Sequence, residues 1–141
     1  AGAVAAAFAA SGFWWLDGLS ATRAAYAAGV ASRRPYGYFL VANLAAFAVV
    51  VGPAAGVALA RLRGRGPWLV TGSALAAIAA ADLSGLSKGE VERIWLPFVP
   101  WVLVATCALA TLRRPTRSAR GWLGLQVAAA LGVQLMVRTP W

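Results

Sequence analysis

The charged residues most able to do chemistry in this chain lie close together, in the stretch LSKGEVERIWLPFVPW at residues 86–101. It holds two of the chain's four acidic residues, Glu90 and Glu92, beside Lys88 and Arg93. Arginine presents a planar fork of N–H donors that matches a phosphate, whereas lysine offers a compact point charge. The chain has no histidine, which removes imidazole acid–base catalysis and histidine-based metal sites within it. These residue types favour the binding of an anion.

Helix capping accounts for part of this charge. Ser87 and Glu90 fit a capping box, in which the serine side chain caps a helix and the glutamate three residues later bonds back to it. Lys88 and Glu92 are four residues apart and can pair weakly on the same helix. The pattern predicts a helix whose N-cap is Ser87.

Arg93 is not explained by capping. It directly precedes the apolar run IWLPFVP, which places it at a membrane edge, where its charged end can extend to water. Pro97 leaves the Arg93 carbonyl without its usual helix donor, and Pro100 does the same for Leu96. The sequence therefore predicts a polar, partly unwound helix start at an interface, which suits an anionic headgroup or a phosphate.

The segment VERIWLPFVPW resembles the E-R-Y-x-L-P-x-x-P segment that opens a late transmembrane helix in many GT-C-type membrane glycosyltransferases. The matching positions are Glu92, Arg93, Leu96, Pro97 and Pro100, while Ile94 and Trp95 stand where an aromatic tyrosine is usual. The upstream residues, FWWLDGLSATRAAYAAGVASRRPYGYFLVANLAAFAVVVGP, are similar to the later half of large actinobacterial integral membrane proteins of that superfamily. The similarity covers nearly all 141 residues, as a C-terminal part.

The resemblance implies an enzyme that takes a sugar from a polyprenyl-phosphate donor at the outer membrane face and transfers it with inversion. In that family the catalytic acidic residue lies in the first external loop, which is not in this chain. We therefore expect no catalytic residue, metal site or cofactor here. By position, Arg93 carries over as a phosphate contact, with Lys88 and Glu92 beside it. The implied partners are membrane lipids, the polyprenyl-phosphate sugar donor and the N-terminal remainder of the same protein.

The elements that must position these residues are apolar. The chain is 61% hydrophobic and 12% charged, with a mean hydropathy of +0.71, whereas soluble domains carry about 25% charged residues. A membrane span needs about 17–25 residues.

We expect an all-α, polytopic transmembrane helical bundle of about five membrane helices plus a short interfacial helix. These helices should form one domain (1–141) that is multi-pass in the cell membrane. Because the first block opens within an apolar run, we also expect a fragment of a larger membrane protein. The apolar blocks run roughly over residues 1–16, 36–60, 67–83, 94–112 and 121–137.

The connectors between the blocks differ in charge. Residues 61–66 (RLRGRG) and 113–120 (RRPTRSAR) are purely basic, whereas 17–35 and 82–93 hold all four acids. Lysine and arginine number seven on the basic side and six on the other. The positive-inside rule alone therefore decides little, and it is the density of the short basic loops that places them in the cytoplasm.

The mixed-charge side offers further candidates. Arg33, Arg34 and Tyr36 lie at the end of the 17–35 connector, and charge and position alone make them candidate contacts for a lipid phosphate. Apolar residues within this connector recur at helical spacing, which predicts the short helix on the membrane surface. The alternative is an exposed linker.

Tryptophans support the block boundaries, because they gather at membrane interfaces. Trp14, Trp15, Trp95 and Trp141 fall at mixed-charge ends, and Trp68 and Trp122 fall at basic ends. Trp101 is expected well inside a block, and Cys107 is expected to be a small buried residue that forms no intrachain disulfide.

A few polar or helix-breaking residues lie inside the apolar blocks: Asn43, Pro53, Gln126 and Gln134, with the small pair Gly52 and Gly56. Buried amides and small residues favour helix–helix contact over a transport path.

Nucleic acid is excluded as a partner, although the net charge is +9. In an apolar chain, basic residues interleaved with aromatic ones mark membrane interfaces. The competing function is a non-enzymatic polytopic membrane module, such as a transporter fragment or an assembly scaffold.

Overall fold

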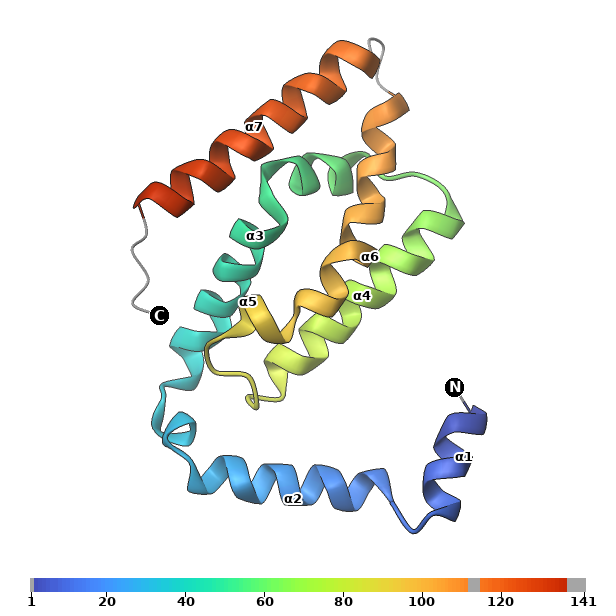
Figure 1. Ribbon diagram of the computed structural model, residues 1–141, viewed down its shortest axis with the longest axis vertical. Coiled ribbons are helices and arrows are strands. Elements are labelled where there is room, and N and C mark those ends of the chain that lie inside the picture. The colour runs from blue at the N-terminus through green and yellow to red at the C-terminus, as the bar shows by residue number, and fades with distance from the viewer. Residues whose placement is uncertain (1, 112–114, 137–141) are drawn as a thin grey trace.

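The chain is all-helical in the part that the computed structural model describes, residues 2–111 and 115–136 (Figure 1). Those residues contain no strand, which confirms the all-α prediction. In chain order the elements are α1 (Gly2–Ala10), α2 (Trp15–Ala28), η1 (Val30–Arg33), α3 (Tyr36–Arg61), α4 (Arg65–Leu83), α5 (Val91–Ile94), η2 (Leu96–Phe98), α6 (Val99–Leu103), η3 (Val104–Thr111) and α7 (Pro115–Met136).

Two helices in the described ranges, α3 and α4, are long and apolar enough to cross a membrane. The expected number of about five membrane helices is not confirmed. The predicted block 94–112 is divided into α5, η2, α6 and η3, and its apolar helical stretch, Leu96–Leu109, is shorter than a span. Pro97 and Pro100 explain the division, because neither has an N–H to continue a helix ladder.

The helix α3 is bent at Gly52, whose backbone has φ 74° and ψ 174° within an otherwise helical run. The next residue, Pro53, has no N–H to offer the carbonyl one turn earlier, so the ladder is already interrupted there. After the bend the second half of α3 changes direction and runs below the upper half of α7 toward η3 (Figure 1).

The core lies where α5, α6 and η3 pack between α3 and α4 (Figure 1). Trp95 is fully buried there, and its ring meets Phe47 edge to face with 5.8 Å between the centroids. Trp101 is 55% exposed. The expected positions of these two tryptophans relative to the membrane stay predictions, and the structure adds that Trp95 packs in the core. The breaks at the prolines turn successive short helices, so that Trp95 faces the core and Trp101 faces outward.

The N-terminal helices stand apart from this core. Neither α1 nor α2 has a buried residue, and α2 runs across the lower end of the molecule (Figure 1). The connector predicted at 17–35 is thus a helix followed by the single turn η1, not an extended linker. Its position on a membrane surface stays a prediction.

Candidate functional site

The mixed-charge connectors meet at one end of the molecule, in a cluster that we call the junction: residues 30–36, loop 84–90, Asn43 and Asp82. Asn43 lies at its centre and is 3% exposed. Its Nδ2 donates to Asp82 Oδ1 at 2.8 Å and also to the carbonyl of Ser87, and its Oδ1 accepts the N–H of Gly89 at 3.3 Å. One buried amide therefore holds the loop against α3 and supplies a donor to the carboxylate of Asp82, which is 4% exposed.

Three of the predicted phosphate contacts come together at the rim of the junction. Arg34 Nη1 donates to the carbonyl of Lys88, and Lys88 Nζ donates to the carbonyl of Ser32 at 3.3 Å. The Tyr36 hydroxyl donates to the carbonyl of Leu83 at 3.0 Å. These contacts tie the 30–36 connector to the loop after α4, which joins segments about fifty residues apart.

The two cations also lie over aromatic rings. Arg34 Cζ is 5.5 Å from the centroid of Phe39, and Lys88 Nζ is 6.0 Å from that of Tyr26. Such placement fixes the long side chains while their charged ends stay near the surface. Arg33, the last residue of η1, is exposed beside them. The junction thus presents Arg33, Arg34 and Lys88 as one cationic rim.

Glu92 and Arg93 lie on the single-turn helix α5, directly after the loop. Glu92 is half-buried and Arg93 is exposed. On either side of them, Val91 and Trp95 are buried in the core, so α5 is anchored by its apolar residues. This anchoring leaves Arg93 on the outer surface, five residues after Lys88 in the sequence.

The predicted capping box is wrong. The helix begins at Val91, with Glu90 in the N-cap position and no side-chain capping bond. Ser87 is buried in the loop, where its carbonyl accepts from Asn43. Gly89 (φ 97°) and Glu90 (φ 57°) are successive left-handed residues that turn the chain sharply before α5. The positive φ favours glycine at residue 89, because a side chain there would be strained, and a Cβ would also displace the end of the Arg34 side chain.

A second amide, half-buried, lies at the bend in α3. Gln126, from α7, donates through Nε2 to the carbonyl of Val51 at 2.9 Å and accepts the N–H of Ala54 at 3.3 Å through Oε1. It therefore supplies hydrogen bonds at the interruption of the helix. This contact between α3 and α7 confirms the predicted role of the amide. Gln134, further along α7, is exposed.

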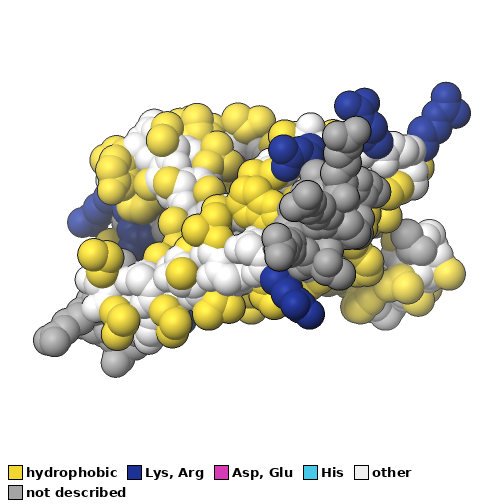
Figure 2. Space-filling model, turned by 90° about the horizontal axis from the view of Figure 1, so that it is seen from above, with side chains coloured by type: hydrophobic (Ala, Val, Ile, Leu, Met, Phe, Trp, Pro, Cys, Tyr) yellow, Lys and Arg dark blue, Asp and Glu magenta, His cyan; other side chains and the backbone are white. Residues whose placement is uncertain are grey.

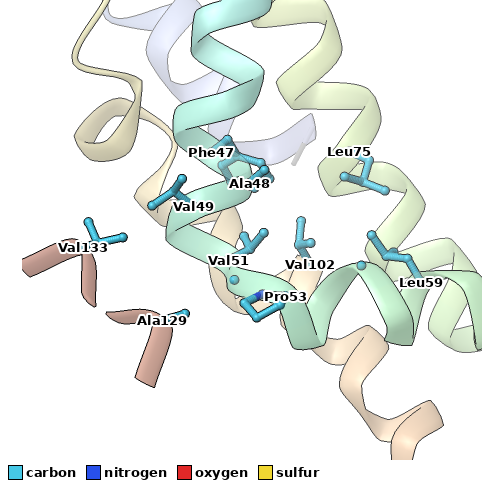
Figure 3. Close-up of a pocket in the computed structure, with 12 residues that line it drawn as sticks. Phe47, Ala48, Val49, Val51, Pro53, Leu59, Leu75, Val102, Ala129 and Val133 are labelled. Atoms are coloured by element: carbon cyan, nitrogen blue, oxygen red, sulfur yellow. The ribbon is translucent and has the colours of Figure 1, made fainter. Parts of the chain in front are cut away.

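An apolar groove of about 650 Å³ lies along the same bend (Figure 3). Residues of α3 on both sides of Gly52 form its floor, and Leu75, Val102, Ala129 and Val133 reach it from α4, α6 and α7. Every side chain that lines it is apolar, so the groove can hold an apolar chain and offers nothing that would bind a charged group.

The described residues contain no cluster of three or more histidine, cysteine or acidic side chains that could hold an ion. Cys107 is exposed, which corrects the prediction that it is buried.

Comparison with protein-family models, with curated proteins and with solved structures gives no significant match for this chain. Its function is therefore inferred from the residues and their geometry.

Proposed function

We propose that this chain is a multi-pass module of the cell membrane that binds a polyprenyl-phosphate sugar donor, as the C-terminal membrane portion of a GT-C-type glycosyltransferase. The observation that carries the proposal is the placement of a cationic rim at the start of α3 and of an apolar groove at the bend of the same helix. A polyprenyl phosphate has the matching division into a charged head and a long apolar tail.

Two helices suited to cross a membrane, α3 and α4, support the membrane location. The extended exposure of large apolar residues on the outside of the molecule supports it as well, since soluble monomers rarely expose large contiguous apolar patches. The orientation that we propose has the junction outside the cell and residues 61–66 and 113–120 in the cytoplasm.

The head of the donor is proposed to lie on the cationic rim. Arg34 uses Nη1 for the carbonyl of Lys88, and a guanidinium has five N–H donors, so other donors remain for a phosphate. Arg33 and Arg93, both exposed, add planar forks of the same kind, and Tyr36 orders the connector through Leu83.

The tail is proposed to lie in the apolar groove. Tyr36 begins α3 next to the rim, and Phe47, eleven residues later, is the first α3 residue that lines the groove. Eleven residues of helix rise by about 16 Å. A polyprenyl tail of several isoprene units that starts at the rim therefore reaches the groove.

A specific observation favours the competing function, a non-enzymatic scaffold. Arg34 and Lys88 both bond to backbone carbonyls. Those bonds hold the connector and the loop together and need no ligand.

Photo-crosslinking of the chain in nanodiscs distinguishes a donor-binding module from a non-enzymatic scaffold. We expect a diazirine-bearing long-chain polyprenyl phosphate to label groove residues such as Val133 about tenfold more than the matching polyprenol probe, because charge-assisted contacts are worth about 1.5–3 kcal/mol. Arg33→Gln, at an exposed position, should reduce the phosphate-dependent labelling, while Arg23→Gln, exposed on α2, should not. Equal labelling by the two probes would leave the scaffold as the better account.

The role of Arg93 is tested in the same assay by Arg93→Lys. Lysine keeps the charge but lacks the planar fork, so a bidentate phosphate contact should be weakened about tenfold or more. If Arg93→Lys retains full labelling while Arg93→Ala only lowers expression, Arg93 is a membrane anchor and not a phosphate contact.

A further inference from the structure

The opposite end of the molecule carries a different charged feature, a pocket of about 490 Å³ between the end of α3 and η3. Arg61 and Arg63 line it together with Ala60, Leu62, Cys107 and Ala108. The pocket therefore has a cationic rim and a small, apolar floor. It is separate from both the junction and the apolar groove, with which it shares no lining residue.

The local backbone explains why the two arginines meet here. Leu62 is extended (φ −62°, ψ 127°), and successive side chains of an extended segment point to opposite sides. Leu62 is 7% exposed and packs in the core cluster with Ala105 and Ala108. Because Leu62 points inward, Arg61 and Arg63 are both directed outward.

The segment is also fixed before any ligand arrives. Trp68 Nε1 donates to the carbonyl of Leu62 at 3.0 Å, across the turn that leads into α4. Gly64, at φ 92°, makes that turn. The backbone that carries the two arginines is therefore already ordered, so that binding has only their side chains to order.

No carboxylate competes for these arginines at this end. The four acidic residues of the chain lie elsewhere, on α2, at the end of α4, and around α5. Figure 2, which views the molecule from above, shows lysine and arginine side chains and no acidic side chain. The dipole of α3 can account for Arg61 in its last turn, but Arg63 lies beyond the helix.

We infer that this pocket binds the phosphodiester headgroup of an anionic glycerophospholipid. The inference rests on the proposed membrane location, and not on the proposed donor. Basic pockets between membrane helices on the cytoplasmic side take such headgroups. The guanidinium forks of Arg61 and Arg63 match the phosphate, and the apolar floor matches the start of the acyl chains.

Cys107 provides the readout, because it lines the pocket, is exposed, and is the chain's single cysteine. The alkylation rate of Cys107 would be measured for the full chain in micelles doped with phosphatidylglycerol or with phosphatidylcholine. We expect phosphatidylglycerol to slow alkylation in a saturable way and phosphatidylcholine not to. Glycerol phosphate, which has the charge without the acyl chains, should give no protection at the same concentration.

Matched variants localise the effect. Arg63→Gln, outside any helix, should raise the phosphatidylglycerol concentration for half-protection about tenfold. Arg120→Gln removes the same charge from an exposed position that does not line the pocket. This variant should change the phosphatidylglycerol concentration for half-protection little. The inference is overturned by absent protection, by equal protection with phosphatidylcholine or glycerol phosphate, or by equal effects of the two variants. Because no polyprenyl probe is used, these outcomes stay readable if the donor proposal fails.

Discussion

Asn43 and Gln126 are both amides inside apolar blocks, and the molecule uses them in different ways. Asn43 is almost fully buried in a closed network with Asp82, Ser87 and Gly89. Gln126 is half-buried and bonds to two backbone groups at the bend in α3. The first amide fixes where a loop lies against a helix, and the second joins two helices that are far apart in the sequence.

The comparison shows that the free-energy cost of losing an amide depends on which polar groups are then left without a hydrogen-bond partner. Without Asn43, the buried Asp82 carboxylate would lose a donor in a place with little access to water. Without Gln126, the groups left behind are backbone atoms beside the apolar groove. Membrane hydrogen bonds average only about 0.6 kcal/mol. The junction should therefore be more sensitive than the bend to loss of its amide.

The largest effect is expected from Asn43→Leu. It removes the donor to Asp82 and leaves the Ser87 carbonyl and the Gly89 N–H without their partner, which should lower the free energy of unfolding by about 3 kcal/mol. Reversible unfolding in mixed micelles, followed by circular dichroism, measures it. Gln134→Leu replaces an exposed amide in a similar apolar block and should cost less than about 0.5 kcal/mol. Equal losses for the two variants would contradict the assigned network.

A smaller but distinctive effect is expected at the bend from Gly52→Ala. A Cβ at residue 52 would collide with the amide of Gln126, and φ 74° strains any residue other than glycine. Together these should cost about 2 kcal/mol. Gly56→Ala is the matched control, because its Cβ would meet nothing within 4 Å and alanine favours a helix interior. If the two alanines behave alike in the same unfolding assay, Gly52 is not the point at which α7 contacts the bend.

The smallest effect is expected from Ser87→Ala. An N-cap serine would lose about 0.5–2 kcal/mol on this change, but here the backbone carbonyl of Ser87 makes the contact with Asn43, and alanine retains that carbonyl. We expect less than about 0.5 kcal/mol. A loss above 1 kcal/mol would restore the capping role and weaken the structural account of loop 84–90.

Composition and periodicity were enough to predict helices throughout, the helical 17–35 connector and a role for Gln126 in helix packing. Those predictions depend on signals within one segment. The bend in α3 was also visible locally, since Gly52 and Pro53 are adjacent.

The unpredicted features depend on pairs of distant residues. Nothing within LSKGE indicates that Asn43 donates a hydrogen bond to the Ser87 carbonyl. The helix start predicted from the local capping pattern is therefore wrong. The proline breaks were foreseen, but not the turn that buries Trp95 and exposes Trp101. Arg34, Tyr36 and Lys88 were each proposed as phosphate contacts, and the bonds that bring them together follow only from the fold.

The central claim is a membrane-embedded module with its junction outside and its basic end inside, and cysteine labelling at the two ends of α4 tests it most directly. In a Cys107→Ser background, Lys88→Cys and Arg65→Cys would each be exposed to a membrane-impermeant maleimide in intact cells. We predict labelling at position 88 and none at position 65 until the cells are permeabilised. Labelling at 65 but not 88 would reverse the orientation, and labelling at both in intact cells would contradict a membrane span between them.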